Sequence, residues 1–301
     1  MKIAIVGPGA IGLYYGALLQ RSGQEVAFLM RSDLAVAKEK GVKVVKKDET
    51  FVLDTVAAFG DAAEIGICDL VVVAMKATGN DGLAKILPPL VGEGTKLLTL
   101  QNGLGNDRLL AELFPENTVL GGLCFVCLNR TAPAVVENYM AGSVSIGPRV
   151  EGDLAAAREI ADLFAAAGLK TRCEPKLREV QWKKLVWNVP FNGLAIAAGG
   201  VTTDMIVENE ALCAEARALM AEILAAAQRF GYDFGDGFAD YQIEITRPMG
   251  PYRPSSMIDF VEDRSVELEA IWGEPLRQAK EAGLAMPKLE LLYALLKRLC
   301  R

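Results

Sequence analysis

The chain has 301 residues, of which 51% are hydrophobic, and its formal net charge is −6. That length exceeds one typical hydrophobic core and predicts two domains. The acidic balance, without a basic run, argues against a nucleic-acid partner but is compatible with a small anionic substrate held by a local cationic site. No apolar run reaches the roughly 18 residues of a membrane span, and residues 1–6 are too short for a signal peptide. We therefore expect a cytoplasmic protein that does not enter a membrane.

The chain contains six cysteines and no histidine. Without histidine, proton transfer must fall to Lys, Asp, Glu, Tyr or Cys, and a metal site is not expected. Cys124 and Cys127 form a CxxC pair inside an apolar run. We interpret them as two packed thiols on a strand, with a redox pair or half a metal site as the alternative.

The predicted elements of the first half alternate between short apolar strands and helices, which is the pattern of a parallel α/β sheet. Strands are expected at residues 2–6, 25–30, 69–75 and 96–100, and helices at 11–21, 83–90 and 107–113. Residues 118–147 change to strand pairs separated by Gly and Pro, which predicts an antiparallel extension. A helix over 154–167 and a last strand over 169–173 complete this half.

After Pro175 the strand signal disappears. Helical periodicity covers residues 176–198, 208–230, 238–246, 266–282 and 288–299. The fold class is therefore α/β, with a Rossmann-type doubly wound domain over residues 1–174 and an all-α domain over residues 175–301.

The first predicted strand runs directly into a glycine-rich turn. Its residues are Gly7, Pro8, Gly9, Ala10, Ile11 and Gly12, a GxGxxG spacing followed by a predicted helix. The first glycine allows the tight turn, the second lets backbone amides approach a pyrophosphate, and the third lets helix and strand pack closely. Glycine-rich turns are common, but this position between strand and helix predicts a dinucleotide site.

Arg31 follows the second predicted strand, where an NAD enzyme usually carries an acidic residue for the ribose hydroxyls. A guanidinium suits the 2′-phosphate of NADP instead, because it can donate two hydrogen bonds to a phosphate. We therefore predict NADPH as the cofactor. The alternative is that Arg31 is an ordinary solvated arginine and Asp33 a helix cap. Lys76 and Asn102 lie in loops after two further strands, at the sheet edge where such ligands bind, and are added to the cofactor site. The alternatives are a solvated loop lysine at position 76 and an ordinary turn at Asn102-Gly103.

Together with the second half, these residues resemble the ketopantoate reductase family (2-dehydropantoate 2-reductase) over essentially the whole chain. The shared features are the GxGxxG start, the arginine after the second strand, the lysine after Val-Ala-Met, and the Gln-Asn-Gly loop. The most specific feature is the block Trp182-Lys183-Lys184-Leu185-Val186-Trp187-Asn188 followed by Asn192, with Ser255-Ser256-Met257 and a glutamate downstream.

The resemblance implies an active site in the cleft between a Rossmann domain and a helical domain. It implies NADPH-dependent reduction of 2-dehydropantoate to (R)-pantoate, a step toward pantothenate and coenzyme A. By the same resemblance, Lys184 is the catalytic lysine and Glu267 an active-site glutamate. Substrate contacts are assigned to Asn102, Asn188, Asn192 and Ser256.

The spacing of Lys184, Asn188 and Asn192 agrees with this assignment, because residues four apart share one face of a helix. The alternative is a solvated surface stripe, against which the apolar flanking residues argue. Hydride addition to a 2-oxo acid creates an alkoxide, and Lys184 can supply both the proton and the positive charge that it needs. Lys183 and Glu267 would shift its pKa in opposite directions.

Several positions depart from the family pattern and leave the 2-oxo acid open. The segment from Ser256 to Glu267 is about one residue short, so Glu269 competes for the role of the glutamate. Residues 77–80 lack a glutamine that is frequent there, and residues 248–254 are rich in proline. One alternative is therefore an NADPH-dependent reductase of another 2-oxo acid or imine. Another is a non-catalytic NADPH-binding sensor, against which the proton-donating Lys184 argues. The apolar C-terminal helices are compatible with a homodimer face or with a core.

Overall fold

The computed structural model describes residues 1–300, apart from the side chain of Ala141. The chain forms two compact units. The first comprises Met1–Gln101 and Asn106–Leu177, and the second comprises Asn102–Gly105 together with the chain from Arg178 onward. A short loop of the N-terminal half therefore belongs to the C-terminal unit.

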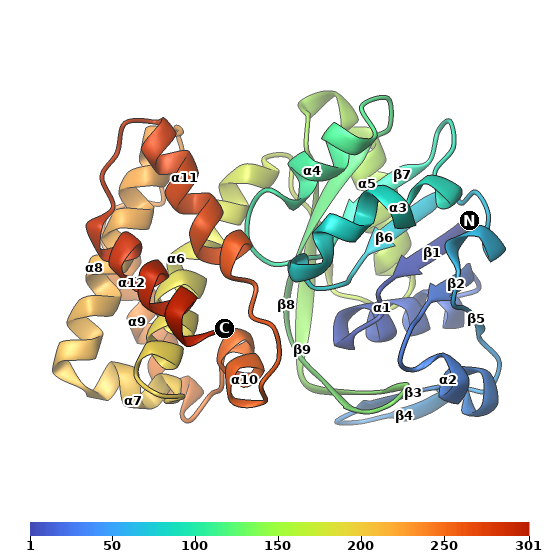
Figure 1. The fold of residues 1–301 in the computed structure, drawn as a ribbon, viewed down its shortest axis with the longest axis horizontal. Helices are drawn as coiled ribbons and strands as arrows, with labels where there is room; N and C mark the ends of the chain where they lie inside the picture. The colour runs from blue at the N-terminus through green and yellow to red at the C-terminus, as the bar shows by residue number, and fades with distance from the viewer. Residues whose placement is uncertain (301) are drawn as a thin grey trace. The chain divides into compact units, whose positions relative to one another are not determined.

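The first unit is built on one mixed sheet (Figure 1). Its strands are β1 (Lys2–Val6), β2 (Glu25–Leu29), β3 (Val42–Lys46), β4 (Thr50–Leu53), β5 (Ala57–Phe59), β6 (Leu70–Val73), β7 (Lys96–Thr99), β8 (Val119–Ala132), β9 (Val135–Pro148) and β10 (Thr171–Cys173). The order is β4-β3-β9-β8-β7-β6-β1-β2-β5, with β10 paired to β9. All pairs from β8 through β7, β6, β1 and β2 to β5 are parallel, whereas β8 and β9 form a long antiparallel ribbon.

Helices cover this sheet on both faces, as the apolar character of its central strands requires. They are α1 (Ala10–Arg21), α2 (Leu34–Lys40), α3 (Leu83–Ile86), α4 (Asn106–Leu113) and α5 (Leu154–Ala166). Strand β1 buries both of its sides: Ile3 and Ile5 join one apolar cluster, and Ala4 and Val6 join another.

The second unit is helical (Figure 1). Its helices are α6 (Leu177–Ala197), α7 (Thr203–Glu208), α8 (Glu210–Arg229), α9 (Phe238–Thr246), α10 (Ser255–Val261), α11 (Glu274–Glu281) and α12 (Pro287–Leu299). A π-helix, Glu269–Gly273, directly precedes α11. The core includes Trp182 and Trp272, both fully buried. The Trp272 indole donates a hydrogen bond to the carbonyl of Val189 inside α6 at 3.0 Å.

The predicted fold class is confirmed, and several local predictions were wrong. The helix expected over 266–282 begins later and opens with a π-helix turn, and the helix expected over 83–90 ends at Ile86 before a 3₁₀ turn. Helices α7 and α10 and strands β3, β4 and β5 were not predicted. Cys124 and Cys127 both lie on strand β8. No helix within residues 1–300 is long and apolar enough to cross a membrane.

The C-terminal leucines divide between core and surface. Leu292 is buried with Trp272, whereas Leu291 and Leu295 are exposed on α12. A homodimer through this exposed stripe stays a prediction.

Candidate active site

The candidate cofactor residues of the first unit follow the carboxyl ends of its parallel strands. β1 lies between β2 and β6, and β7 follows β6 in the sheet. The chain continues from β1 into α1 and then to β2 on one side, and it returns to β6 on the other. Such a reversal of strand order is where open α/β sheets bind dinucleotides. Gly7, Arg31 and Lys76 all lie at this edge.

Packing within the protein requires glycine at two positions of the glycine turn, Gly7 and Gly12, but not at Gly9. Gly7 has a φ of +68°, and an added Cβ would lie 2.2 Å from the Cβ of Met75. At Gly12 an added Cβ would lie 3.0–3.2 Å from Ile5, Ala74 and Pro8, so this glycine lets α1 approach β1. At Gly9 no atom lies within 4 Å of an added Cβ. Its bare backbone therefore leaves open space at the start of α1, which no side chain caps. These features fit a pyrophosphate.

Arg31 is exposed at the end of β2, and among residues 1–300 it has no ion-pair partner. Asp33 begins α2, but its side chain does not cap that helix. Instead, the Asp33 carboxylate accepts hydrogen bonds from the backbone N–H of Ala134 and from Arg130, both at 2.9 Å. The acidic residue at the end of β2 is therefore turned into the protein, and Arg31 remains at the surface.

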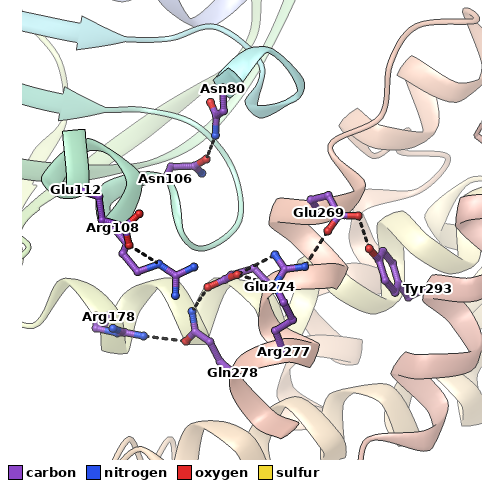
Figure 2. A network of polar contacts seen from close by, with 10 residues as sticks. All are labelled: Asn80, Asn106, Arg108, Glu112, Arg178, Glu269, Glu274, Arg277, Gln278 and Tyr293. Atoms are coloured by element: carbon purple, nitrogen blue, oxygen red, sulfur yellow. Dashed lines mark hydrogen bonds and ion pairs between the residues drawn. The ribbon is translucent and has the colours of Figure 1, made fainter. Parts of the chain in front are cut away.

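The loops after β6 and β7 are joined by a chain of side-chain amides. Asn80 donates to Asn106 at 2.9 Å (Figure 2). It also accepts a hydrogen bond from Gln101 at 2.7 Å. Thr99 in turn donates to Gln101 at 3.0 Å. Lys76 begins the 3₁₀ turn Ala77–Gly82 that carries Asn80. Asn80 lies in segment 77–80, which lacks the glutamine frequent in the family. Its hydrogen bonds to Asn106 and Gln101 hold the loop that begins at Lys76 in place.

The loop Asn102–Gly105 is embedded in the helical unit. Leu104 is buried in the core of that unit, and its N–H donates to the carbonyl of Ala270 in the π-helix at 2.9 Å. Gly103 has a φ of +82°, and an added Cβ would lie 2.2 Å from the same carbonyl oxygen. Only glycine allows this approach, because other residues would meet backbone that cannot move aside. The docking of Gly103 and Leu104 fixes the position of Asn102.

Lys184 and Asn102 are in direct contact. The Lys184 ammonium donates a hydrogen bond to Asn102 Oδ1 at 3.0 Å, although the residues are 82 positions apart. Lys184 lies on α6 and is half-buried, with the buried Leu185 and Val186 next to it in the chain. The structure therefore brings together two residues that the sequence placed in one site, and it holds the ammonium at one defined position.

The other polar residues of the α6 face differ in their engagement. Asn192 is 2% exposed; its Oδ1 accepts from the backbone N–H of Ser256, and its Nδ2 donates to the carbonyl of Asn188, both at 3.0 Å. By contrast, the side-chain amide of Asn188 and the hydroxyl of Ser256 make no hydrogen bond within residues 1–300. Both residues are largely buried, which makes their side-chain polar atoms candidates for contact with a ligand.

Glu267 and Glu269 are clearly different. Glu267 is buried shortly before the π-helix. Glu269 is engaged at the surface, where it accepts hydrogen bonds from Tyr293 and from Arg277 (Figure 2). Burial raises the pKa of Glu269, but these two hydrogen bonds outweigh burial and leave the pKa below its ordinary value. Burial and the hydrogen bond to Glu269 raise the pKa of Tyr293 to about 12. Because Glu269 is committed to this network, Glu267 is the better candidate for the active-site glutamate.

Comparisons with known proteins agree along the whole chain. Residues 3–151 match the family model described as ketopantoate reductase PanE/ApbA, and residues 176–299 match its C-terminal counterpart. A 2-dehydropantoate 2-reductase of Nostoc is 38% identical over 98% of this chain and 94% of the relative.

Solved structures give the same result. The crystal structure of 2-dehydropantoate 2-reductase from Geobacter metallireducens matches with a TM-score of 0.95 and 40% identity, over 99% of both chains. A ternary complex of D-mandelate dehydrogenase with NADH and anilino(oxo)acetate shares the fold at a TM-score of 0.89 and 23% identity, over 99% of this chain and 98% of that one. The chain therefore belongs to the ketopantoate reductase family, whose members are nicotinamide-dependent oxidoreductases.

Proposed function

We propose that this protein reduces 2-dehydropantoate to (R)-pantoate with NADPH, a step toward pantothenate and coenzyme A. The activity named for relatives that match nearly the full chain supports this substrate. The observation that carries the proposal is the contact between Lys184 and Asn102, which fixes an ammonium in the helical unit. We further propose that residues 1–174 serve as the nucleotide-binding domain and residues 175–301 as the substrate and catalytic domain.

The residues that would hold the cofactor are Gly7 to Gly12, Arg31, Lys76 and Asn102. The open space at Gly9 suits a pyrophosphate, and the exposed Arg31 suits a 2′-phosphate. The nicotinamide, when bound, supplies the hydride that adds to the C2 carbonyl.

Lys184 acts in this proposal as the general acid. Its ammonium donates a proton to the C2 oxygen as negative charge develops there, and its positive charge stabilises that oxygen. Asn102 orients the ammonium by accepting a hydrogen bond from it. Asn188, Ser256 and Glu267 are proposed to hold the substrate, because all three are largely buried polar residues and, among residues 1–300, the side chains of the first two make no hydrogen bond.

Asn192 is proposed to act through Ser256. Its amide already joins the backbones of α6 and α10, so it positions the Ser256 hydroxyl instead of being the main contact to the substrate.

A second candidate is reduction of a different 2-oxo acid on the same scaffold. We include it because a ternary complex of D-mandelate dehydrogenase with NADH and anilino(oxo)acetate shares this fold. Steady-state kinetics with 2-dehydropantoate, pyruvate, 2-oxoisovalerate and phenylglyoxylate separate the two. We expect the largest kcat/KM for 2-dehydropantoate. Higher values for any of the other acids would reject this substrate, and no turnover with any of them despite NADPH binding would favour a sensor.

A further inference from the structure

Asp33 is a buried carboxylate next to the proposed 2′-phosphate site, and it is surrounded by hydrogen-bond donors. Its side chain is 5% exposed. One oxygen accepts from the Ala134 N–H at 2.9 Å, and the other accepts from Ser32 Oγ at 2.8 Å and from Arg130 Nη1 at 2.9 Å. An acidic residue at the end of the second strand would repel a 2′-phosphate, but this one forms an ion pair with Arg130 and faces the protein.

Arg130 lies near the C-terminal end of β8, 97 positions after Asp33 in the chain. Its Nη1 also lies 3.4 Å from Ser32 Oγ, so the guanidinium lies beside the residue that directly follows Arg31. The side chain is 43% exposed. A guanidinium has five donors, and the contacts within residues 1–300 use only Nη1. Nε and Nη2 therefore remain to bind a ligand.

We propose that Arg130 is a second cation of the 2′-phosphate site, acting beside Arg31 to select NADPH over NADH, and that Asp33 is its positioning residue. This inference rests on the proposed use of NADPH. A phosphate with charge near −2 is bound far better by two guanidinium groups than by one, because each adds charge-assisted hydrogen bonds. The ribose hydroxyl of NADH offers no such charge, so the second arginine affects only the phosphorylated cofactor.

A purely structural role for Arg130 makes a different prediction. The turn between β8 and β9 contains Ala134, a non-glycine residue with a φ of +57°, and Asp33 anchors this turn. If Arg130 only braces the turn, its removal lowers the melting temperature and leaves the ratio of the two cofactor affinities unchanged.

The test measures the Kd of NADPH and of NADH by nicotinamide fluorescence for the full-length protein and its variants. Arg130→Gln should raise the Kd of NADPH by about tenfold or more while the Kd of NADH stays unchanged. Arg130→Lys keeps the positive charge but cannot donate two hydrogen bonds in the planar geometry of a guanidinium. It should therefore lose less NADPH affinity than Arg130→Gln. Asp33→Asn should give a smaller loss in the same direction. Arg172→Gln is the matched control, because Arg172 lies on β10, which pairs with the opposite end of β9.

The outcomes separate this inference from the function on which it rests. If Arg31→Ala reduces the preference for NADPH and Arg130→Gln does not, Arg130 has no part in selection and the NADPH assignment stands. Equal losses for NADPH and NADH in Arg130→Gln, together with a lower melting temperature, would also reject the inference. If the wild-type protein binds both cofactors equally, the NADPH assignment itself is wrong.

Discussion

The Lys184 ammonium donates to Asn102 Oδ1 over 3.0 Å, and the contact lies wholly within the helical unit. Asn102 belongs to that unit because Leu104 and Gly103 dock its loop onto the π-helix. A loop that the sequence assigns to the cofactor-binding half thus orients the residue proposed to act as general acid.

Replacing Asn102 tests this orientation. Asn102→Ala should lower kcat by roughly 10- to 100-fold, because a hydrogen bond to a charged group is worth about 1.5–3 kcal/mol. Asn102→Asp keeps the acceptor and adds a negative charge, which raises the pKa of the Lys184 ammonium. In a pH profile of kcat, the activity of Asn102→Asp should therefore fall at a higher alkaline pH than that of the wild type. Normal kcat in Asn102→Ala would show that the contact does not matter for the reaction.

The two hydrogen bonds of Asn192 predict a loss of stability as well as activity. Asn192→Ala leaves the buried N–H of Ser256 without its partner, which costs about 1–3 kcal/mol of unfolding free energy. Because Ser256 then shifts, kcat/KM should also fall. Asn209→Ala is the control: Asn209 caps α8 by accepting from the N–H of Leu212, and its loss should cost about 1 kcal/mol without changing kcat/KM. Unchanged stability with a raised KM would show that Asn192 binds the substrate directly.

The close approach of Gly103 to Ala270 predicts a severe effect of any side chain. Gly103→Ala should destabilise the protein by more than about 3 kcal/mol and reduce activity, because the new Cβ meets a backbone carbonyl. Gly283→Ala isolates the cost of the backbone angle: its φ is +79° and no atom lies within 4 Å of an added Cβ. That variant should lose about 1 kcal/mol. Equal melting temperatures for the two variants would contradict the packing argument.

The lowered pKa of Glu269 predicts a pH dependence of stability. A carboxyl whose pKa is lowered by folding stabilises the protein above its ordinary pKa of 4.5, and that contribution is lost as pH falls through the folded value. Glu269→Gln should therefore flatten the loss of stability on acidification. The effect should stay below about 1 kcal/mol, because the side chain is 60% exposed. Glu244→Gln, which removes an exposed pair with Arg247, is the control for a simple surface ion pair. A Glu269→Gln variant with unchanged acid stability but abolished turnover would instead make Glu269 the active-site glutamate.

The sequence predicts local features of this fold well and distant contacts poorly. Strands such as β1 and β6 are nearly continuous apolar runs, and the α6 residues at spacing four share one face by geometry alone. The helices α7 and α10 have 6 and 7 residues, which is too short for a clear periodic signal.

The site residues that no local sequence pattern marks depend on long-range contacts. Asn80 and Asn106 are 26 positions apart, and Arg130 and Asp33 are 97 positions apart. No local pattern marks such partners. In the sequence, Arg130 is only an arginine within the predicted strand pairs of residues 118–147. Its proximity to Asp33 follows from the strand order of the sheet, which the sequence does not show.

The role of Lys184 is tested by measuring NADPH oxidation with 2-dehydropantoate for the wild-type protein and for Lys184→Ala, with NADH as the comparison. The wild type should turn over with a clear preference for NADPH. Lys184→Ala should keep its NADPH affinity and lose about 10²–10⁴-fold in kcat, the usual contribution of general acid catalysis. Near-normal kcat in Lys184→Ala at saturating cofactor and substrate would contradict the central claim that this lysine donates the proton.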